Sequence, residues 1–519
     1  GIYTVDAAAT ITVSDITTSG GASTLTDGNG GDAGKITFDS GGTITLDDST
    51  ITAAGGAEDG SGAQGAGADI TFVNSVALTT GSAVISTGDT GGTIEFQKTI
   101  NGSQDLSLTA GSGNVTLTGV VGGAVDGNNA NIGRLGAIDI ASAADVTATA
   151  ITAASLTQQA GSGTTTFNGA IDTNALAGVS ITGTNLAVNS TINTTTGGTV
   201  TFDQSGTATI AAAGDITADG AVSITAAGGI NTAGNITTTN DNVTFKSATT
   251  LTGGIVINTD TGLGTVAFNS TLDSDADGSG NTNARTLEIT AGTGNIDFDA
   301  KVGNAKALGL VTINSADIVD TDATFESAGL DWTATTEIQL DGTVTSTSTV
   351  DLTAALIDVN KGMVARGQLI DLNAGADGLT VDGGNLIASG AFADLAGGNI
   401  DIDSVGNVVI NSNLMATGDD VAGVGLAGGD VTIDVTGAGN TIDISADIST
   451  GGGRSTGDVA QGGAAGSIRL NTNNGLITLT GNNLSAYGGS GSTRGAGGAI
   501  TISDELELAG QTVMLDTGL

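Results

Sequence analysis

The amino-acid sequence predicts an all-β fold, a right-handed parallel β-helix whose coils stack into a three-faced solenoid. Three observations predict it: an apolar-polar-apolar triplet that returns once per coil, the complete absence of proline, and 87 glycines among 519 residues. A continuous parallel ladder needs almost every backbone N–H group, and proline has none to donate. From the repeat we expect roughly 20 coils of about 22 residues each.

The clearest part of the repeat lies between residues 179 and 289. Its triplets are Val179/Ile181, Val200/Phe202, Val222/Ile224, Val243/Phe245, Val266/Phe268 and Leu287/Ile289. The two-residue alternation of a strand places the apolar residues of each triplet in the core and the middle residue in solvent. Two further columns recur about one coil apart: Val188, Ile210, Ile230 and Leu251, and Ile192, Ile216, Ile236 and Ile257. Three strands in each coil define a solenoid with three faces.

The residues between the strands are mainly Gly, Asn and Asp, as in Gly197-Gly198 and Asn240-Asp241. These residue types tolerate the positive φ angles of sharp corners. We therefore expect each strand to end at a corner of the coil.

Toward both ends of the chain, Gly-rich segments precede a strand, as in GDAGKITF from Gly31 and GAAGSIRL from Gly463. The coil lengthens there to between 31 and 37 residues. The added residues must bulge from a corner, because a strand cannot lengthen without displacing its neighbours. We expect one continuous solenoid over residues 1–519, with loop-decorated coils in 1–90, smooth coils in duplicated blocks in 91–395, and loop-decorated coils again in 396–519.

The composition excludes several classes of function. The net charge of −42 argues against nucleic acid or an anionic membrane as a partner. No apolar run approaches the ~20 residues of a membrane span, so we expect no membrane insertion. The sequence contains no Cys and no His, so it has no disulfide or thiolate metal site, and a Ser or Thr nucleophile would lack a histidine base. We expect neither an enzyme nor a required cofactor.

One motif carries specific chemistry, the segment DSDADG from Asp273. Alternate carboxylates followed by Gly are typical of the first half of a calcium loop, and their spacing turns Asp273, Asp275 and Asp277 toward one centre. The twelfth loop position is Ala284 instead of a bidentate Glu, so the full pattern fails. Two interpretations stay open: a calcium site formed by the three aspartates, and an acidic corner loop in solvent.

Longer strings, such as GTVTFDQSGTATIAAAGDITADGAVSITAAGG from Gly198 and GAGADITF from Gly65, resemble the β-strand repeat arrays of giant bacterial surface proteins similar to filamentous haemagglutinin. The resemblance covers nearly the whole chain and lies in composition and repeat pattern. It implies export across the outer membrane and a role as an adhesin, a matrix component or a surface fibre. Because the amino-terminal secretion domain of such proteins is not recognisable here, we expect an interior or processed segment.

The expected function is that of an extracellular rod on the bacterial cell surface or in its matrix, a subunit or segment of a fibre or sheath that associates with copies of itself. The strand-like segments Ile2–Val5 and Val513–Leu515 have no evident cap, and exposed strand edges invite pairing with another chain. Gly-rich loops such as residues 451–466 would also need a partner to hold them. The alternative is the stalk of a giant adhesin that presents a separate binding domain to a host or neighbouring cell. The partners would then be glycans or proteins of that cell surface.

Overall fold

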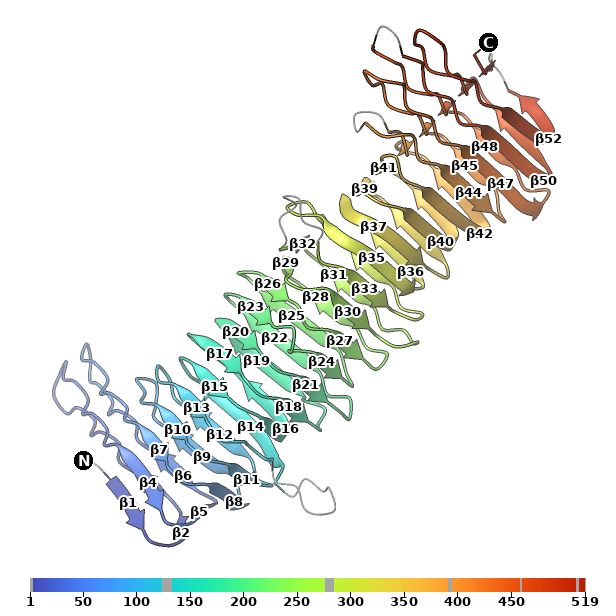
Figure 1. Cartoon of the computed structure of the whole chain (residues 1–519). Helices are drawn as coiled ribbons and strands as arrows, with labels where there is room; N and C mark the ends of the chain where they lie inside the picture. The colour runs from blue at the N-terminus through green and yellow to red at the C-terminus, as the bar shows by residue number, and fades with distance from the viewer. Residues whose placement is uncertain are drawn as a thin grey trace. The chain divides into compact units, whose positions relative to one another are not determined.

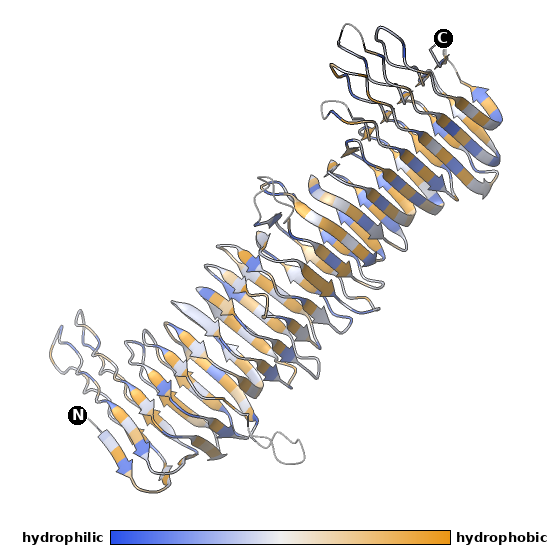
Figure 2. Cartoon of the chain, in the orientation of Figure 1, coloured by the Kyte–Doolittle hydropathy of each residue, from blue (hydrophilic) through white to orange (hydrophobic). Residues whose placement is uncertain are grey.

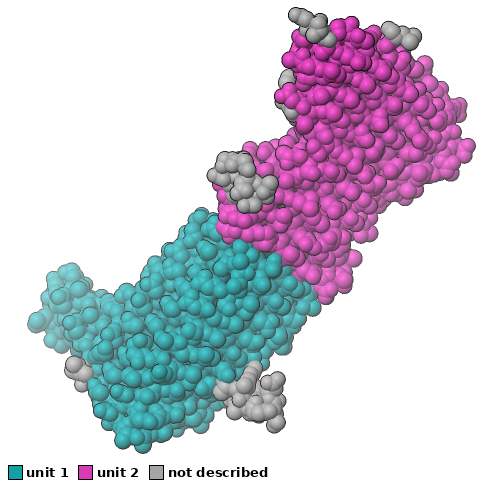
Figure 3. All heavy atoms as spheres, viewed as in Figure 1, with its two compact units in different colours: residues 1–249 teal, residues 250–519 magenta. Residues whose placement is uncertain are grey.

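The computed structural model describes residues 3–123, 133–275, 284–390, 394–457, 460–509 and 513–518. The chain divides into two compact units, residues 1–249 and 250–519, which Figure 3 colours separately. The described residues contain no helix, and hence none that is long and apolar enough to cross a membrane. Their regular structure consists of parallel β-strands, which confirms the predicted all-β parallel β-helix. That the two units form one continuous solenoid stays a prediction.

Unit 1 is built from three ladders of parallel strands (Figure 1). Ladder A contains β1 (Tyr3–Ala7), β4 (Ile36–Ser40), β7 (Ile70–Phe72), β10 (Ile94–Phe96), β13 (Val115–Leu117), β15 (Val146–Ala148), β17 (Thr164–Phe167), β20 (Asn185–Val188), β23 (Ala208–Ile210) and β26 (Ile230–Thr232). Ladder B contains β2 (Ile11–Val13), β5 (Ile44–Asp47), β8 (Val76–Thr80) and β11 (Ile100–Gly102) and, beyond a single bridge at Val121, the first half of β16 (Ile151–Gln158), β18 (Ile171–Thr173), β21 (Ile192–Thr194), β24 (Ile216–Ala218) and β27 (Ile236–Thr238). Ladder C contains β3 (Ile16–Thr17), β6 (Thr50–Thr52), β9 (Ala83–Ser86), β12 (Leu106–Thr109), β14 (Leu135–Ser142), the second half of β16, β19 (Val179–Gly183), β22 (Val200–Gln204), β25 (Val222–Ala226) and β28 (Val243–Phe245).

Unit 2 also contains three parallel ladders, and β29 (Thr249–Leu251) contains the boundary between the units. Ladder D contains β30 (Ile255–Asn258), β33 (Leu287–Thr290), β35 (Leu308–Ser315), the second half of β37 (Phe325–Thr333), the first halves of β40 (Val350–Val359) and β42 (Ile370–Val381), β44 (Ile400–Ser404), β47 (Val431–Ala438) and the first halves of β50 (Ile468–Leu479) and β52 (Ile500–Leu508). Ladder E contains β31 (Val266–Phe268), β34 (Ile296–Phe298), β36 (Ile318–Thr321), β38 (Glu337–Leu340), the second halves of β40 and β42, β45 (Val408–Ile410), β48 (Ile442–Ile444) and the second halves of β50 and β52. Ladder F contains β32 (Leu272–Ser274), a bridge at Val302, the first half of β37, β39 (Val344–Ser346), β41 (Met363–Ala365), β43 (Leu386–Ile387), β46 (Leu414–Met415), β49 (Ile448–Ser449), β51 (Asn483–Ser485) and β53 (Met514–Asp516).

The core of each unit consists of like side chains stacked on like. Hydrophobic and hydrophilic residues alternate along the strands (Figure 2), because successive side chains of a strand point to opposite faces of a sheet. In unit 1, the rings of Phe38, Phe72 and Phe96 stack with centroid distances of 4.9 and 4.4 Å. In unit 2, Trp332 packs edge-on against Phe325 at 5.1 Å. Register is therefore set by the core, since a slip of one residue would expose every apolar side chain.

Two of the three predicted columns of unit 1 are confirmed. Val179, Val200, Val222 and Val243 pair in register in ladder C, and Ile192, Ile216 and Ile236 follow one another in ladder B. The column that begins at Val188 is confirmed only in part, because Val188 pairs with Ile210 but Ile230 pairs with Ala208. The predicted corners are also confirmed where φ is positive, at Gly197 (70°) and Asn240 (60°).

The column position predicted for the Leu287/Ile289 triplet is wrong. Leu287 pairs with Ile255, whereas Val266 pairs with Ile296 in another ladder. The same triplet pattern occurs on more than one face, so a spacing of one coil length in the sequence does not by itself identify the face.

Candidate functional sites

The predicted calcium loop begins in β32 of unit 2. The Asp273 carboxylate accepts hydrogen bonds from the backbone N–H groups of residues 305–306, with N···O distances of 2.8 and 3.3 Å. The Asp275 carboxylate forms an ion pair with Arg285 at 2.6 Å, and hydrogen bonds from this guanidinium lower the pKa of Asp275. Asp277 lies outside the described residues. Calcium binding by Asp273, Asp275 and Asp277 therefore stays a prediction.

If this segment binds calcium, a chelator is expected to lower the melting temperature of the native chain, because an ion that binds only the folded state stabilises it. The triple variant Asp273→Asn, Asp275→Asn, Asp277→Asn should then melt at the same temperature with and without chelator. Differential scanning calorimetry measures both. The absence of heat on titrating calcium into the native chain would leave the solvated acidic loop as the interpretation.

Carboxylates form a row on the outer face of ladder E. Asp297 of β34 pairs in register with Asp320 of β36, and Gln339 and Asp358 continue the row on the next two strands. A second row lies just after the ends of these four strands, at Asp299, Asp322, Asp341 and Asn360, and continues after β42 at Asp382. The two rows concentrate negative charge on one face of unit 2.

Three of these carboxylates converge. One oxygen from each of Asp320, Asp322 and Asp341 lies within 4.8 Å of the other two. Burial, and then the charges of Asp322, Asp341 and Asp297, raise the pKa of Asp320 to about 6. Its Oδ1 atom is buried without a hydrogen-bond partner among the described residues. Since hard cations take oxygen ligands, Asp320, Asp322 and Asp341 are described residues that could hold one.

Replacing Asp320 by Asn is expected to raise the melting temperature of unit 2 at pH 7. The pKa of Asp320 is higher in the folded chain than its ordinary value of 3.8, so the stabilisation by proton binding is complete below pH 3.8 and is lost as the pH rises through about 6. With screening by solvent, we expect a gain on the order of 1 kcal/mol at pH 7 and almost none at pH 4. Thermal melts of both proteins at the two pH values measure this, with Asp377→Asn, an exposed carboxylate outside both rows, as the control. An equal gain at both pH values would contradict the prediction.

A third row of carboxylates lies on the outer face of ladder D. Asp331, Asp351, Asp371 and Asp401 pair in register on four consecutive strands. Burial is the main cause that raises the pKa of Asp351, Asp371 and Asp401, and neighbouring aspartates add to it in each case. At neutral pH the charged carboxylates of this row therefore lower the stability of the fold, mainly because they are partly buried.

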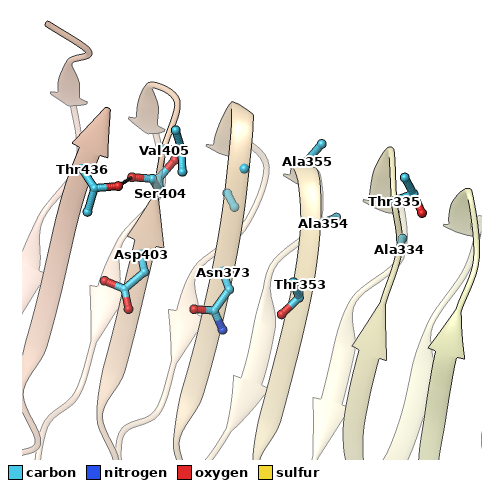
Figure 4. A pocket seen from close by; sticks show the side chains of 12 residues that line it. Ala334, Thr335, Thr353, Ala354, Ala355, Asn373, Asp403, Ser404, Val405 and Thr436 are labelled. Carbon is cyan, nitrogen blue, oxygen red and sulfur yellow. Dashed lines mark hydrogen bonds between the residues drawn. The ribbon is translucent and has the colours of Figure 1, made fainter. Parts of the chain in front are cut away.

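A groove of about 480 Å³ lies beside this row. Figure 4 shows Thr353, Asn373 and Asp403 one after another on neighbouring strands, with the methyl group of Ala354 close by. A hydroxyl, an amide and a carboxylate spaced one coil apart can hydrogen-bond an extended polar ligand that crosses the strands.

The three carboxylate rows were not predicted from the sequence. The signal of the first and third rows is an Asp in the middle of a triplet at intervals of one coil, as in VDL, IDL and IDI at residues 350–352, 370–372 and 400–402. The signal becomes visible only when the strands are aligned by coil.

Two glycine fins project where the Gly-rich segments leave the coils (Figure 1). The N-terminal fin, in unit 1, comprises residues 18–34 and 54–68, and the C-terminal fin, in unit 2, comprises the described residues 416–429, 450–457, 460–466 and 486–498. In each fin, outgoing segments form one layer and returning segments form a second. The buried Thr450 hydroxyl donates a hydrogen bond to the Gly466 carbonyl at 2.8 Å and closes the base of one such loop.

Backbone hydrogen bonds join the two layers of the C-terminal fin. The Gly453 N–H of one outgoing segment donates to the Leu426 carbonyl of the previous returning segment at 2.7 Å. The Gly463 N–H then donates to the Gly453 carbonyl, and the Gly489 N–H to the Gly463 carbonyl, both at 2.8 Å. Other N–H groups bond to the next coil within the same layer, such as Gly452 to the Tyr487 carbonyl at 3.1 Å. The segments thus form a continuous backbone network.

The N-terminal fin has the same network. The Gly56 N–H donates to the Gly31 carbonyl, the Gly31 N–H to the Gly21 carbonyl, and the Gly65 N–H to the Gly56 carbonyl, at 2.8 to 2.9 Å. Both fins therefore use glycine for the same purpose, although they belong to different units.

Close approach of the layers, and not φ, requires glycine in the fins. A Cβ atom on Gly463 would lie 2.0 Å from the Leu426 oxygen, and one on Gly65 would lie 2.0 Å from the Gly31 oxygen. Neither Gly463 nor Gly65 has a left-handed φ. That a partner holds these loops stays a prediction, and the hydrogen bonds within the chain provide a second explanation for the order of the described fin residues.

No protein-family model, no curated protein and no solved structure matches this chain at a significant level. The case for its function therefore depends on its own residues and on the resemblance of its repeats.

Proposed function

We propose that this chain is a structural segment of an extracellular bacterial fibre, sheath or matrix, and that copies of it associate. The observation that carries the proposal is the repetition within each unit, where coil after coil presents three strands in register around a stacked core. In such an array each coil contacts mainly its neighbours, so most of the sequence contributes to length and surface.

Location outside the cell and kinship with proteins similar to filamentous haemagglutinin are part of the proposal. They are supported by the repeat strings from Gly65 and Gly198 and by the strongly acidic composition. The net charge of −42 also supports the proposal that nucleic acids and anionic membranes are not partners of this chain.

Sedimentation velocity over a hundredfold range of concentration tests self-association. We expect the sedimentation coefficient to rise with concentration, and electron microscopy of the concentrated sample to show filaments or sheets. A chain that stays monomeric at every concentration would contradict self-association and favour the stalk of a giant adhesin.

The stalk is the second candidate, and one observation favours it. The glycine fins are held by hydrogen bonds within one chain, so their order needs no second copy. A stalk would present a separate domain to a host or neighbouring cell, with glycans or proteins of that cell as partners. The groove beside Thr353, Asn373 and Asp403 supports an extended glycan as one such partner. Binding of soluble cell-surface glycans to the monomeric chain, lost in the Asn373→Ala variant, would support this candidate.

We also propose that the chain is not an enzyme. The lack of any histidine supports this. Incubation with polysaccharides is expected to release no reducing ends, and release that Asp403→Asn abolishes would contradict the proposal.

A further inference from the structure

We propose that copies of this chain join fin to fin: the tip of the N-terminal fin of one copy docks into a groove on the C-terminal fin of another. The inference rests on the proposed self-association and names the surfaces that produce it. Groove shape, charge and the matching architecture of the two fins carry the argument.

The receiving surface is a groove across the outgoing layer of the C-terminal fin. It consists of two adjoining cavities of about 410 and 390 Å³, which share Asp420, Gly452 and Tyr487. The Tyr487 side chain is 40% exposed, and its ring lies 3.5 Å from the point where a Cβ atom of Gly451 would stand. Glycine therefore leaves a smooth backbone floor beside one aromatic ring.

The groove carries an unusual charge for this chain. Arg454 and Arg494 both line it, although the sequence has only 12 basic residues. Arg454 is exposed, and its guanidinium forms no ion pair with the described residues. Asp419 and Asp420 lie in the same groove, but both carboxylates already accept backbone N–H groups, Asp419 from Asp420 at 2.8 Å and Asp420 from Arg454 at 2.5 Å. This part of the groove is thus suited to acidic side chains.

The tip of the N-terminal fin has the complementary character. Leu25 is 72% exposed and stands beside three exposed carboxylates, Asp27, Glu58 and Asp59. Residues 18–34 and 54–68 contain no Lys or Arg.

The acidic tip is held in one conformation. The Ser61 backbone N–H and hydroxyl donate hydrogen bonds to the Asp27 carboxylate at 2.8 and 2.9 Å, and these bonds lower the pKa of Asp27. The Asp59 N–H donates to the Gly28 carbonyl at 3.1 Å, which ties the tips of two successive coils together. An apolar side chain and fixed negative charges can thus meet Tyr487 and the two arginines without first becoming ordered.

The two fins also match in spacing. Both are stacks of glycine segments with the same backbone network, so the segments of both fins lie one coil apart, about 4.8 Å. Because the two surfaces differ, the contact is heterologous and leaves one fin of each kind free on a pair of copies. Such a contact can continue from copy to copy into a filament.

Charge reversal on either fin tests the contact. The variant Arg454→Glu, Arg494→Glu and the variant Glu58→Lys, Asp59→Lys are each expected to associate about 100-fold more weakly than the native chain, because like charges then face each other. A 1:1 mixture of the two variants is expected to regain association, since every contact in an alternating chain again pairs opposite charges. Sedimentation velocity at low salt measures all four samples. Unchanged circular-dichroism spectra and melting temperatures show that the variants fold.

Arg469→Glu is the matched control, since Arg469 is an exposed arginine of unit 2 that pairs with Asp434 on a sheet face. It is expected to leave association unchanged. If the native chain associates but the charge-reversed variants associate equally well, or if their mixture stays monomeric, the fin contact is wrong and self-association stands. A native chain that is monomeric at every concentration overturns both.

Discussion

Replacing Phe245 by Asp is expected to lower the free energy of unfolding by more than about 5 kcal/mol. Phe245 is fully buried and pairs in register with Ile224 of the previous coil. The change removes a large core side chain, which alone costs about 3–5 kcal/mol, and places a carboxylate among apolar neighbours. Since coils are stabilised by their neighbours, the damage extends to the adjacent coils.

Urea denaturation followed by circular dichroism measures this effect. Thr201→Asp is the control, because Thr201 is the exposed middle residue of an equivalent triplet in β22. The control is expected to change stability by less than about 1 kcal/mol. An unchanged midpoint for Phe245→Asp would show that this column does not face the core.

Replacing Gly463 by Ala is expected to separate the two layers of the C-terminal fin. The new Cβ atom would lie 2.0 Å from the Leu426 oxygen, which belongs to the backbone and cannot turn away. The hydrogen bonds of Gly463 to Gly453 and of Gly489 to Gly463 would lengthen or break. Two or three lost bonds at about 1 kcal/mol each predict a local loss of about 2–3 kcal/mol.

Hydrogen exchange detects such a loss better than a thermal melt, because the fin can open while the strands stay folded. The amide protons of Gly453 and Gly489 are expected to exchange faster by roughly 30-fold or more, as 2 kcal/mol implies. Gly423→Ala is the matched control, since nothing lies within 4 Å of its added Cβ atom. Equal exchange in both variants would refute the close-packed fin.

The stacked core could be predicted from the sequence because two sequence periods, the two-residue alternation of a strand and the length of a coil, together place its residues. Alternation along the strand identifies the inner face, and the coil length brings Val179, Val200 and Val222 into one column. The same reasoning assigned Leu287 to the wrong ladder. An insertion before Leu287 moves the next triplet to another face of the solenoid, and the triplet pattern itself does not change. A single sequence gives the spacing between triplets, but only the pairing of the strands shows which face each triplet occupies.

The fins and the carboxylate rows were harder to predict for physical reasons. The bonds between Gly453, Gly463 and Leu426 join backbone atoms, which every residue has, so the glycines indicate only that side chains are excluded. The raised pKa of Asp320 depends first on burial, which only the fold determines, then on the charge of Asp322 and on that of Asp341, which is 21 residues away in the sequence and one coil away in space. Neither effect has a local signature.

In a fin that is held together by backbone atoms, some positions tolerate mutation and others do not. Every amino acid other than glycine carries a Cβ atom, so any missense change at Gly453, Gly463 or Gly489 would place that atom within 2.0 Å of a carbonyl oxygen. Ala427 and Ala464, on the outside of the returning layer, are exposed, and drift there leaves the network intact. Genetic variation would therefore accumulate on the outer surface of the fins while their interior stays fixed, so that the contacts of the fibre can diversify over an unchanging scaffold.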